Sequence, residues 1–127
     1  MKRLGLAIVL WLCWSCAALA QQFITPTTMR DADLTLTNTQ NLVTTLNTFT
    51  AQRTITIPGR GAMNAYYLQI VDAARAINGS NSLRIVAADG ALINGSASVA
   101  VTSTGAYIFI IASPDGYVAN IAYLCTN

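Results

Sequence analysis

Short stretches in which apolar and polar residues alternate recur along most of this chain, and each stretch ends at Gly, Asn, Asp or Pro. Strict alternation places every second side chain on the same face of a strand, so each stretch predicts a short β-strand with one buried face. The turn residues recur about every eight to twelve positions, the spacing of small all-β domains. We therefore expect an all-β fold, a small β-sandwich or β-roll of about seven short strands.

Three of the predicted strands carry specific expectations. Residues 83–87 should pair with residues 66–72 across the turn at Asn78-Gly79-Ser80-Asn81. Residues 106–111 form the most hydrophobic stretch of the body and should lie inside a sheet. Residues 42–49 have apolar positions that would also fit a short helix, but the threonines among them are poor helix formers and favour a strand.

The N-terminus has the order of a secretory signal peptide. Lys2 and Arg3 precede an apolar run, and Ala18-Leu19-Ala20 provides the small residues that a signal peptidase recognises. We expect a hydrophobic helix over residues 1–20, cleaved after export; retention as a membrane anchor is the alternative. Residues 21–32 lack periodicity and contain Pro26, so we expect an arm or linker there. The β-domain should span residues 33–127.

The charged residues exclude several classes of function. The chain has no His and no Glu, and Lys2 is its last lysine. Seven basic residues less Lys2 and Arg3 leave five, against five aspartates, so the body is neutral. Scattered arginines do not form a phosphate-binding surface, and we expect no nucleic-acid partner. Without histidine there is no hydrolase triad or histidine-rich zinc site, and we expect no enzyme activity, no cofactor and no metal.

Several polar and aromatic residues have both a functional and a structural interpretation. Asp72, Asp89 and Asp115 lie at strand ends or beside glycine, where turn hydrogen bonding explains them better than a calcium or catalytic site does. The five tyrosines fit either sheet packing or a platform for glycan or protein binding. If one patch binds a partner, Tyr67 and Tyr117 are the candidates, because both adjoin polar or turn residues.

The order of motifs from Thr54 to Ile121 resembles small β-modules of tail-fibre, appendage and decoration proteins of tailed bacteriophages. The resemblance lies in a strand ending at Pro58, a strand ending at Asp72, an Ile-Asn-Gly turn at residues 93–95, a Ser- and Val-rich strand, and Asp115-Gly116 followed by an aromatic residue. It covers about two-thirds of the body. Tyr117 stands where such modules often carry Trp, and a signal-like N-terminus is unusual for a virion protein.

The resemblance implies a non-enzymatic virion component that decorates a surface or helps to attach to the host. It also implies a homo-oligomer, with a trimer favoured over other states, and other virion proteins or a cell-surface glycan as partners. An exported bacterial β-domain for adhesion or envelope binding is the alternative, because it explains residues 1–20. The two interpretations place the chain either in the virion or in the periplasm or extracellular space, with membrane contact through residues 1–20 alone.

Overall fold

The computed structural model describes residues 25–60 and 67–123. These residues fold into strands, turns and loops, with no α-helix among them, which confirms the predicted all-β class. The strands are β1 (Thr25–Met29), β2 (Leu34–Thr35), β3 (Gln40–Thr45), β4 (Arg53–Ile57), β5 (Tyr67–Val71), β6 (Leu83–Ala87), β7 (Val99–Val101), β8 (Ala106–Ser113) and β9 (Gly116–Tyr123).

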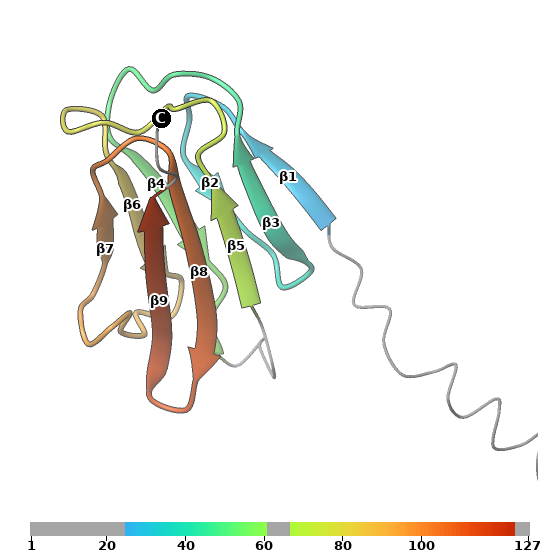
Figure 1. Ribbon diagram of the computed structural model, residues 1–127. Helices are drawn as coiled ribbons and strands as arrows, with labels where there is room; N and C mark the ends of the chain where they lie inside the picture. Colours follow the sequence, from blue (N-terminus) through green and yellow to red (C-terminus); the bar gives the residue numbers. More distant parts are fainter. Residues whose placement is uncertain (1–24, 61–66, 124–127) are drawn as a thin grey trace, which may run out of the picture.

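The strands form two mixed sheets that face each other (Figure 1). The five-stranded sheet has the order β1-β3-β5-β8-β9, and the four-stranded sheet has the order β2-β4-β6-β7. From β1 to β6 the chain alternates between the sheets, and each new strand pairs in parallel with the strand two before it. The last three strands are added antiparallel, β7 to β6, β8 to β5 and β9 to β8. The chain thus winds through both sheets before a hairpin completes the larger one.

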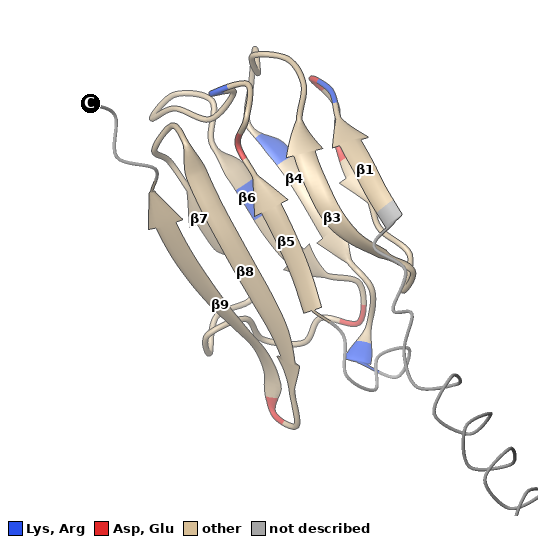
Figure 2. Ribbon diagram, turned by 45° about the vertical axis from the view of Figure 1, so that its right-hand side comes forward, with Lys and Arg blue, Asp and Glu red and all other residues tan. Residues whose placement is uncertain are grey.

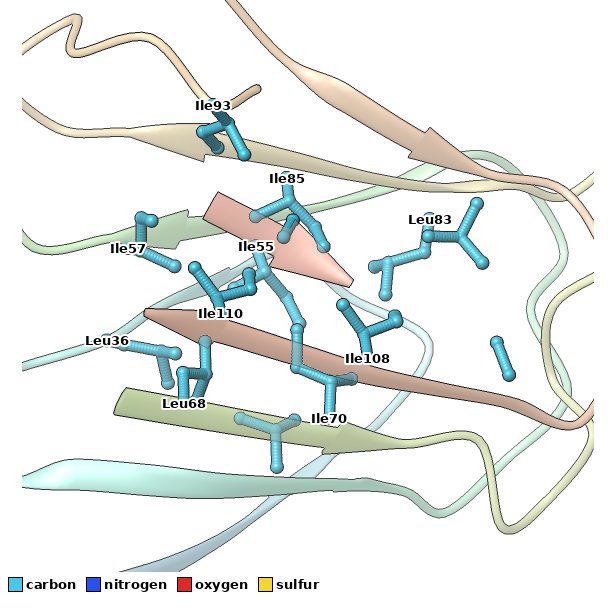
Figure 3. Close-up of a cluster of buried hydrophobic side chains, with 14 of the residues drawn as sticks. Leu36, Ile55, Ile57, Leu68, Ile70, Leu83, Ile85, Ile93, Ile108 and Ile110 are labelled. Carbon is cyan, nitrogen blue, oxygen red and sulfur yellow. The ribbon is translucent and has the colours of Figure 1, made fainter. Parts of the chain in front are cut away.

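A single hydrophobic core fills the space between the sheets (Figure 3). In β5, Leu68 and Ile70 are fully buried while the residues between them are half-buried, so period-two alternation determines which side chains enter the core. The same alternation holds in β3, β4 and β8. The four-stranded sheet contributes Ile55, Ile57, Leu83 and Ile85, and the five-stranded sheet contributes Val43, Leu68, Ile70, Ile108 and Ile110.

The structure differs from the sequence prediction at the N-terminal side of the domain. Nine strands are found in the described residues rather than about seven. One of the additional strands, β1, lies inside the 21–32 segment that the sequence predicted as an arm or linker, and it pairs with β3. Pro26 is tolerated because β1 is an edge strand, where a missing N–H need not break a ladder, and the register shifts beside it. The hydrophobic helix predicted over residues 1–20 lies outside the described residues.

The predicted pairing of residues 83–87 with residues 66–72 is wrong. β5 and β6 lie in different sheets, and β6 pairs with β4 and β7 instead. The turn itself is present, because the Asn78 side-chain oxygen accepts hydrogen bonds from the backbone N–H groups of Ser80 and Asn81 at 3.0 and 2.9 Å. It redirects the chain from one sheet to the other rather than closing a hairpin.

Other expectations are confirmed wholly or in part. β8 lies between β5 and β9 inside its sheet. Residues 40–45 form strand β3 rather than a helix, but residues 46–49 of the predicted strand lie in the loop that follows it. Positive φ angles were expected at both Asn-Gly turns and are found at one: φ is 51° at Asn94 and 76° at Gly95, whereas Asn78 and Gly79 are not among the residues with positive φ.

Candidate binding surface

The outward side of the five-stranded sheet is built from the residues that alternate with the core. In β8, Tyr107 and Phe109 are half-buried and Ile111 is 43% exposed, while the residues between them are buried. Tyr67, Gln69 and Val71 alternate in the same way in β5, and Val118 and Asn120 are exposed on β9. We call these eight residues the outer face; they come from three adjacent strands.

The strand register arranges the outer face in rows across the sheet. Gln69 is opposite Phe109, which is opposite Asn120. Tyr67, Ile111 and Val118 form the row on one side, and Val71 and Tyr107 lie in the row on the other. The rings of Tyr67 and Phe109 are diagonal neighbours with centroids 6.0 Å apart and planes inclined at 34°. Their rings therefore form one aromatic area beside two amide side chains.

No charged residue belongs to any of the five strands of this sheet (Figure 2). The strands of the other sheet carry Arg53 on β4 and Arg84 on β6, and Arg84 is exposed on the opposite side of the molecule. A partner that binds this sheet contacts only uncharged side chains of the strands. No ionised side chain of these strands therefore has to leave water on binding. The electrostatics of the outer face therefore suit a neutral partner.

The polar groups of the outer face are open to a ligand. The amides of Gln69 and Asn120 and the hydroxyls of Tyr67 and Tyr107 make no hydrogen bond within the described part of the chain. Amides and phenols each donate and accept hydrogen bonds. The face thus combines an aromatic area with unused neutral donors and acceptors.

Tyr67, the first of the two tyrosines proposed from the sequence, lies on this face and contacts Phe109. Tyr117 does not, and its prediction as a surface residue is corrected by its burial: it is 2% exposed. Its hydroxyl donates a 2.6 Å hydrogen bond to the carbonyl oxygen of Pro58. Burial raises the pKa of the Tyr117 phenol, and the negative charge of Asp89 raises it further. The structure therefore separates the two candidates.

The carboxyl group of Asp72 is a buried structural centre. It follows β5 and is 1% exposed. Its Oδ1 accepts hydrogen bonds from the Thr45 hydroxyl at 2.8 Å and the Ala76 N–H at 2.7 Å. Its Oδ2 accepts from the N–H groups of Gly105 at 2.9 Å and Ile77 at 3.4 Å. These bonds connect β3, the loop after β5 and the turn before β8, in agreement with the structural interpretation.

The other two aspartates weighed in the sequence also lie in loops and turns. Asp89 accepts hydrogen bonds from the N–H groups of Arg60 at 2.7 Å and Ala91 at 3.0 Å. These bonds, that of Arg60 first, hold the pKa of Asp89 below its usual range. Asp115 is exposed at the tip of the β8–β9 hairpin. Among residues 25–60 and 67–123 no group of three or more His, Cys, Asp or Glu side chains could hold a metal ion.

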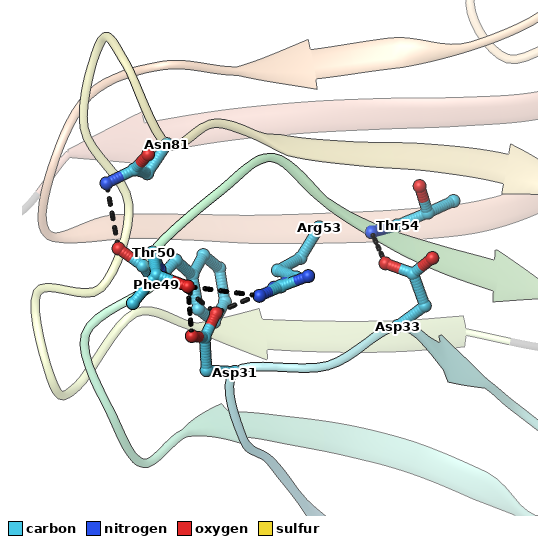
Figure 4. A network of polar contacts seen from close by, with 7 residues as sticks. All are labelled: Asp31, Asp33, Phe49, Thr50, Arg53, Thr54 and Asn81. Atoms are coloured by element: carbon cyan, nitrogen blue, oxygen red, sulfur yellow. Dashed lines mark hydrogen bonds and ion pairs between the residues drawn. The ribbon is translucent and has the colours of Figure 1, made fainter.

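A polar network ties the β1–β2 connection to β4 (Figure 4). Asp31 accepts a 2.6 Å hydrogen bond from Nε of Arg53 and further bonds from the hydroxyl and N–H of Thr50. The Arg53 bond is the largest cause that lowers the pKa of Asp31, followed by the Thr50 hydroxyl. Asp33 accepts a hydrogen bond from the N–H of Thr54 at 2.8 Å. The network is structural and lies away from the outer face.

A shallow pocket of about 320 Å³ adjoins the outer face at the β8–β9 hairpin. Its lining includes Leu92, Asn94, Asp115 and Val118, and Val118 is shared with the outer face. The Asn94 amide already bonds both the N–H and the carbonyl oxygen of Ala119, at 2.9 and 2.8 Å. The pocket therefore extends the apolar edge of the face at Leu92 and Val118 and places the exposed carboxylate of Asp115 beside it.

Most of the outer face was not singled out from the sequence. Gln69, Phe109 and Asn120 come together because β5 pairs with β8 and β8 with β9. Alternation placed Gln69 on the same face of its strand as Tyr67 and Val71, but the uniformly apolar residues 106–111 gave no such signal for Phe109, and nothing local indicates that residues 67–71 and 107–111 are neighbours.

The comparisons with known proteins place the chain in no family. No protein-family model matches it, and no curated protein matches its sequence. No helix within the described residues has the length and apolar character needed to cross a membrane.

Proposed function

We propose that this chain is a non-enzymatic structural or binding module of the virion-appendage or decoration type, which contacts a host surface through the outer face of its five-stranded sheet. The observation that carries the proposal is the outer face itself: a contiguous, uncharged area of aromatic, aliphatic and amide side chains on a rigid sheet. Contiguous exposed apolar area of this kind marks interaction surfaces. The order of motifs from Thr54 to Ile121 supports the phage type.

Attachment of the labelled full chain to cells of the producing or host bacterium tests the role of the face. Ile111→Lys places a charge among its apolar residues and should abolish attachment, because the charge would have to leave water on contact. Thr35→Lys adds the same charge to an exposed residue of β2 in the other sheet and should leave attachment unchanged. Equal attachment of both variants would contradict the proposal.

An exported adhesion or envelope-binding domain is the second candidate, and residues 1–20 favour it. The mass of the expressed protein distinguishes the two. A mature product beginning at Gln21 supports export, whereas intact Met1 in purified virions supports the virion role.

We further propose that the chain assembles as a homo-oligomer, a trimer, through strand edges. The second half of β9 supports this assembly. Leu92 and Asn94 already bond the outer backbone groups of Tyr117 and Ala119, whereas residues 120–123 lie at the edge of the sheet without proline or charge, and such edges invite pairing with another chain. A stable monomer in light scattering would contradict the assembly.

A further inference from the structure

We propose that the outer face binds a neutral carbohydrate, with Tyr67, Gln69, Phe109 and Asn120 as the contact residues. The inference rests on the proposed function and specifies its partner. It begins with the central row, in which Phe109 lies between Gln69 on β5 and Asn120 on β9. Neighbouring strands are about 4.8 Å apart, so this row spans about 10 Å across three strands, enough for a short oligosaccharide.

The chemistry of the row matches a sugar ring. One face of a pyranose presents C–H groups, which pack on an aromatic ring, and its rim presents hydroxyls, which both donate and accept hydrogen bonds. Phe109 and Tyr67 supply the aromatic area, with centroids 6.0 Å apart. The amides of Gln69 and Asn120, on either side of Phe109, supply hydrogen-bond donors and acceptors for those hydroxyls.

The absence of charge from the five strands restricts the ligand further. A sulfated or uronic-acid glycan would require a cation to pair with, and the described arginines lie in loops or on the other sheet (Figure 2). A neutral glycan requires no cationic side chain in the binding surface.

A second copy of this chain fits the face less well. Two copies packed face to face would remove the amides and phenols of Tyr67, Gln69, Tyr107 and Asn120 from water at the centre of the contact. These groups have no partner within the described residues. A second copy would offer only the same few groups at fixed positions on a sheet, whereas a glycan offers a hydroxyl at nearly every ring carbon to bond them.

The test is calorimetric titration of the full chain with cellohexaose, mannohexaose and chitohexaose as neutral probes and hexagalacturonate as the anionic probe. At least one neutral probe should bind, and more tightly than the anionic one. Tyr67→Ala and Asn120→Ala should each weaken that binding roughly tenfold, the usual loss for a central contact.

Two variants act as matched controls. Tyr123→Ala removes a 50% exposed tyrosine from β9 whose register partner is buried Ala106, so its side chain does not belong to the outer face. Asn47→Ala removes an exposed asparagine from the β3–β4 loop. Both should change binding by less than about twofold, as surface substitutions away from a contact do. Circular dichroism of each variant verifies that the sheet structure is retained.

Three results of the titrations would overturn the inference: no binding of any neutral probe, preference for hexagalacturonate, or binding that survives Tyr67→Ala and Asn120→Ala. Conversion of an oligomer to a monomer by Ile111→Lys would also overturn it, because the face would then be a subunit interface. If Ile111→Lys abolishes attachment to cells while no neutral probe binds, the binding function stands and the carbohydrate does not.

Discussion

The hydroxyl of Tyr117, at the start of β9, donates a 2.6 Å hydrogen bond to the carbonyl oxygen of Pro58, the residue after β4. The two residues are 59 positions apart and both are buried; Tyr117 lies in the five-stranded sheet, and Pro58 directly follows a strand of the four-stranded sheet. The N–H of Tyr117 also donates to the carbonyl oxygen of Leu92 at 2.8 Å. Tyr117 therefore fastens the last hairpin both to the four-stranded sheet and to the segment before β7.

Removing this one hydroxyl should lower stability. Tyr117→Phe keeps the ring but leaves the buried Pro58 oxygen without its donor, so we expect a loss of about 1–2 kcal/mol in the free energy of unfolding. Urea denaturation monitored by circular dichroism measures it. Tyr123→Phe removes the hydroxyl of an exposed tyrosine on the same strand and should change stability by less than about 0.5 kcal/mol. Equal midpoints for the two variants would contradict the structural role of the bond.

Asp72 should be sensitive even to an isosteric change. Asp72→Asn replaces one acceptor oxygen by an amide NH₂, which would point at groups that are themselves donors. We expect a loss of about 2–4 kcal/mol in the free energy of unfolding. The exposed carboxyl of Asp115 provides the comparison, and Asp115→Asn should cost less than about 0.5 kcal/mol in the same urea titration. A small effect at Asp72 would show that its four bonds are dispensable.

The sequence predicts which side chains point inward better than it predicts which strands are neighbours. Alternation in residues 66–72 separates Leu68 and Ile70 from Tyr67, Gln69 and Val71, and the structure buries the first pair, because inside and outside follow from the period of a strand. The Asn78 turn looks like a hairpin, yet it joins strands of different sheets. Parallel pairing between β4 and β6 has no turn of its own to reveal it, because partners in register lie 30 positions apart, as Arg53 and Leu83 do.

The sequence predicted only part of the outer face, because it reveals the face of a strand on which a residue lies but not the neighbours of that strand. Tyr67 lies on the outer face because its strand alternates regularly. Tyr117 follows the turn Asp115-Gly116, which suggests exposure, but Gly116 has φ 148° and Tyr117 turns inward. Phe109 carries no local signal that distinguishes it from any other strand residue. It is a candidate contact residue because Gln69 and Asn120 lie on either side of it, and only the pairing of distant segments brings these residues together.

The Asp31–Arg53 pair should make stability depend on acid. The hydrogen bond from Arg53 lowers the pKa of Asp31 in the folded protein below the unfolded value of about 3.9. The carboxylate therefore contributes stability above that pH, and the contribution is lost as the pH falls through the folded pKa. Asp31→Asn should be less stable than the natural protein at pH 7, and the difference should narrow below about pH 4.

Urea midpoints measured at a series of pH values test this dependence. Arg53→Gln removes the largest cause of the shift and should flatten the acid dependence in part, because both Thr50 hydrogen bonds to Asp31 remain. Arg84→Gln changes an arginine of the same sheet that makes no described contact with Asp31, and it should keep the full dependence. Parallel curves for the natural protein and Asp31→Asn would contradict the pKa shift.

Gly116 should tolerate a side chain much less well than Gly79. Its φ of 148° is a conformation that L-residues rarely adopt, and an added Cβ would lie 2.3 Å from the carbonyl oxygen of Leu92. Gly116→Ala should therefore cost about 2–4 kcal/mol of unfolding free energy. Gly79→Ala is the matched change, because an added Cβ there meets nothing within 4 Å, and it should be neutral within about 0.5 kcal/mol. The close approach of Gly116 to Leu92 also directs Tyr117 inward. Equal urea midpoints for the two alanine variants would therefore contradict the packing of the hairpin against residues 91–95.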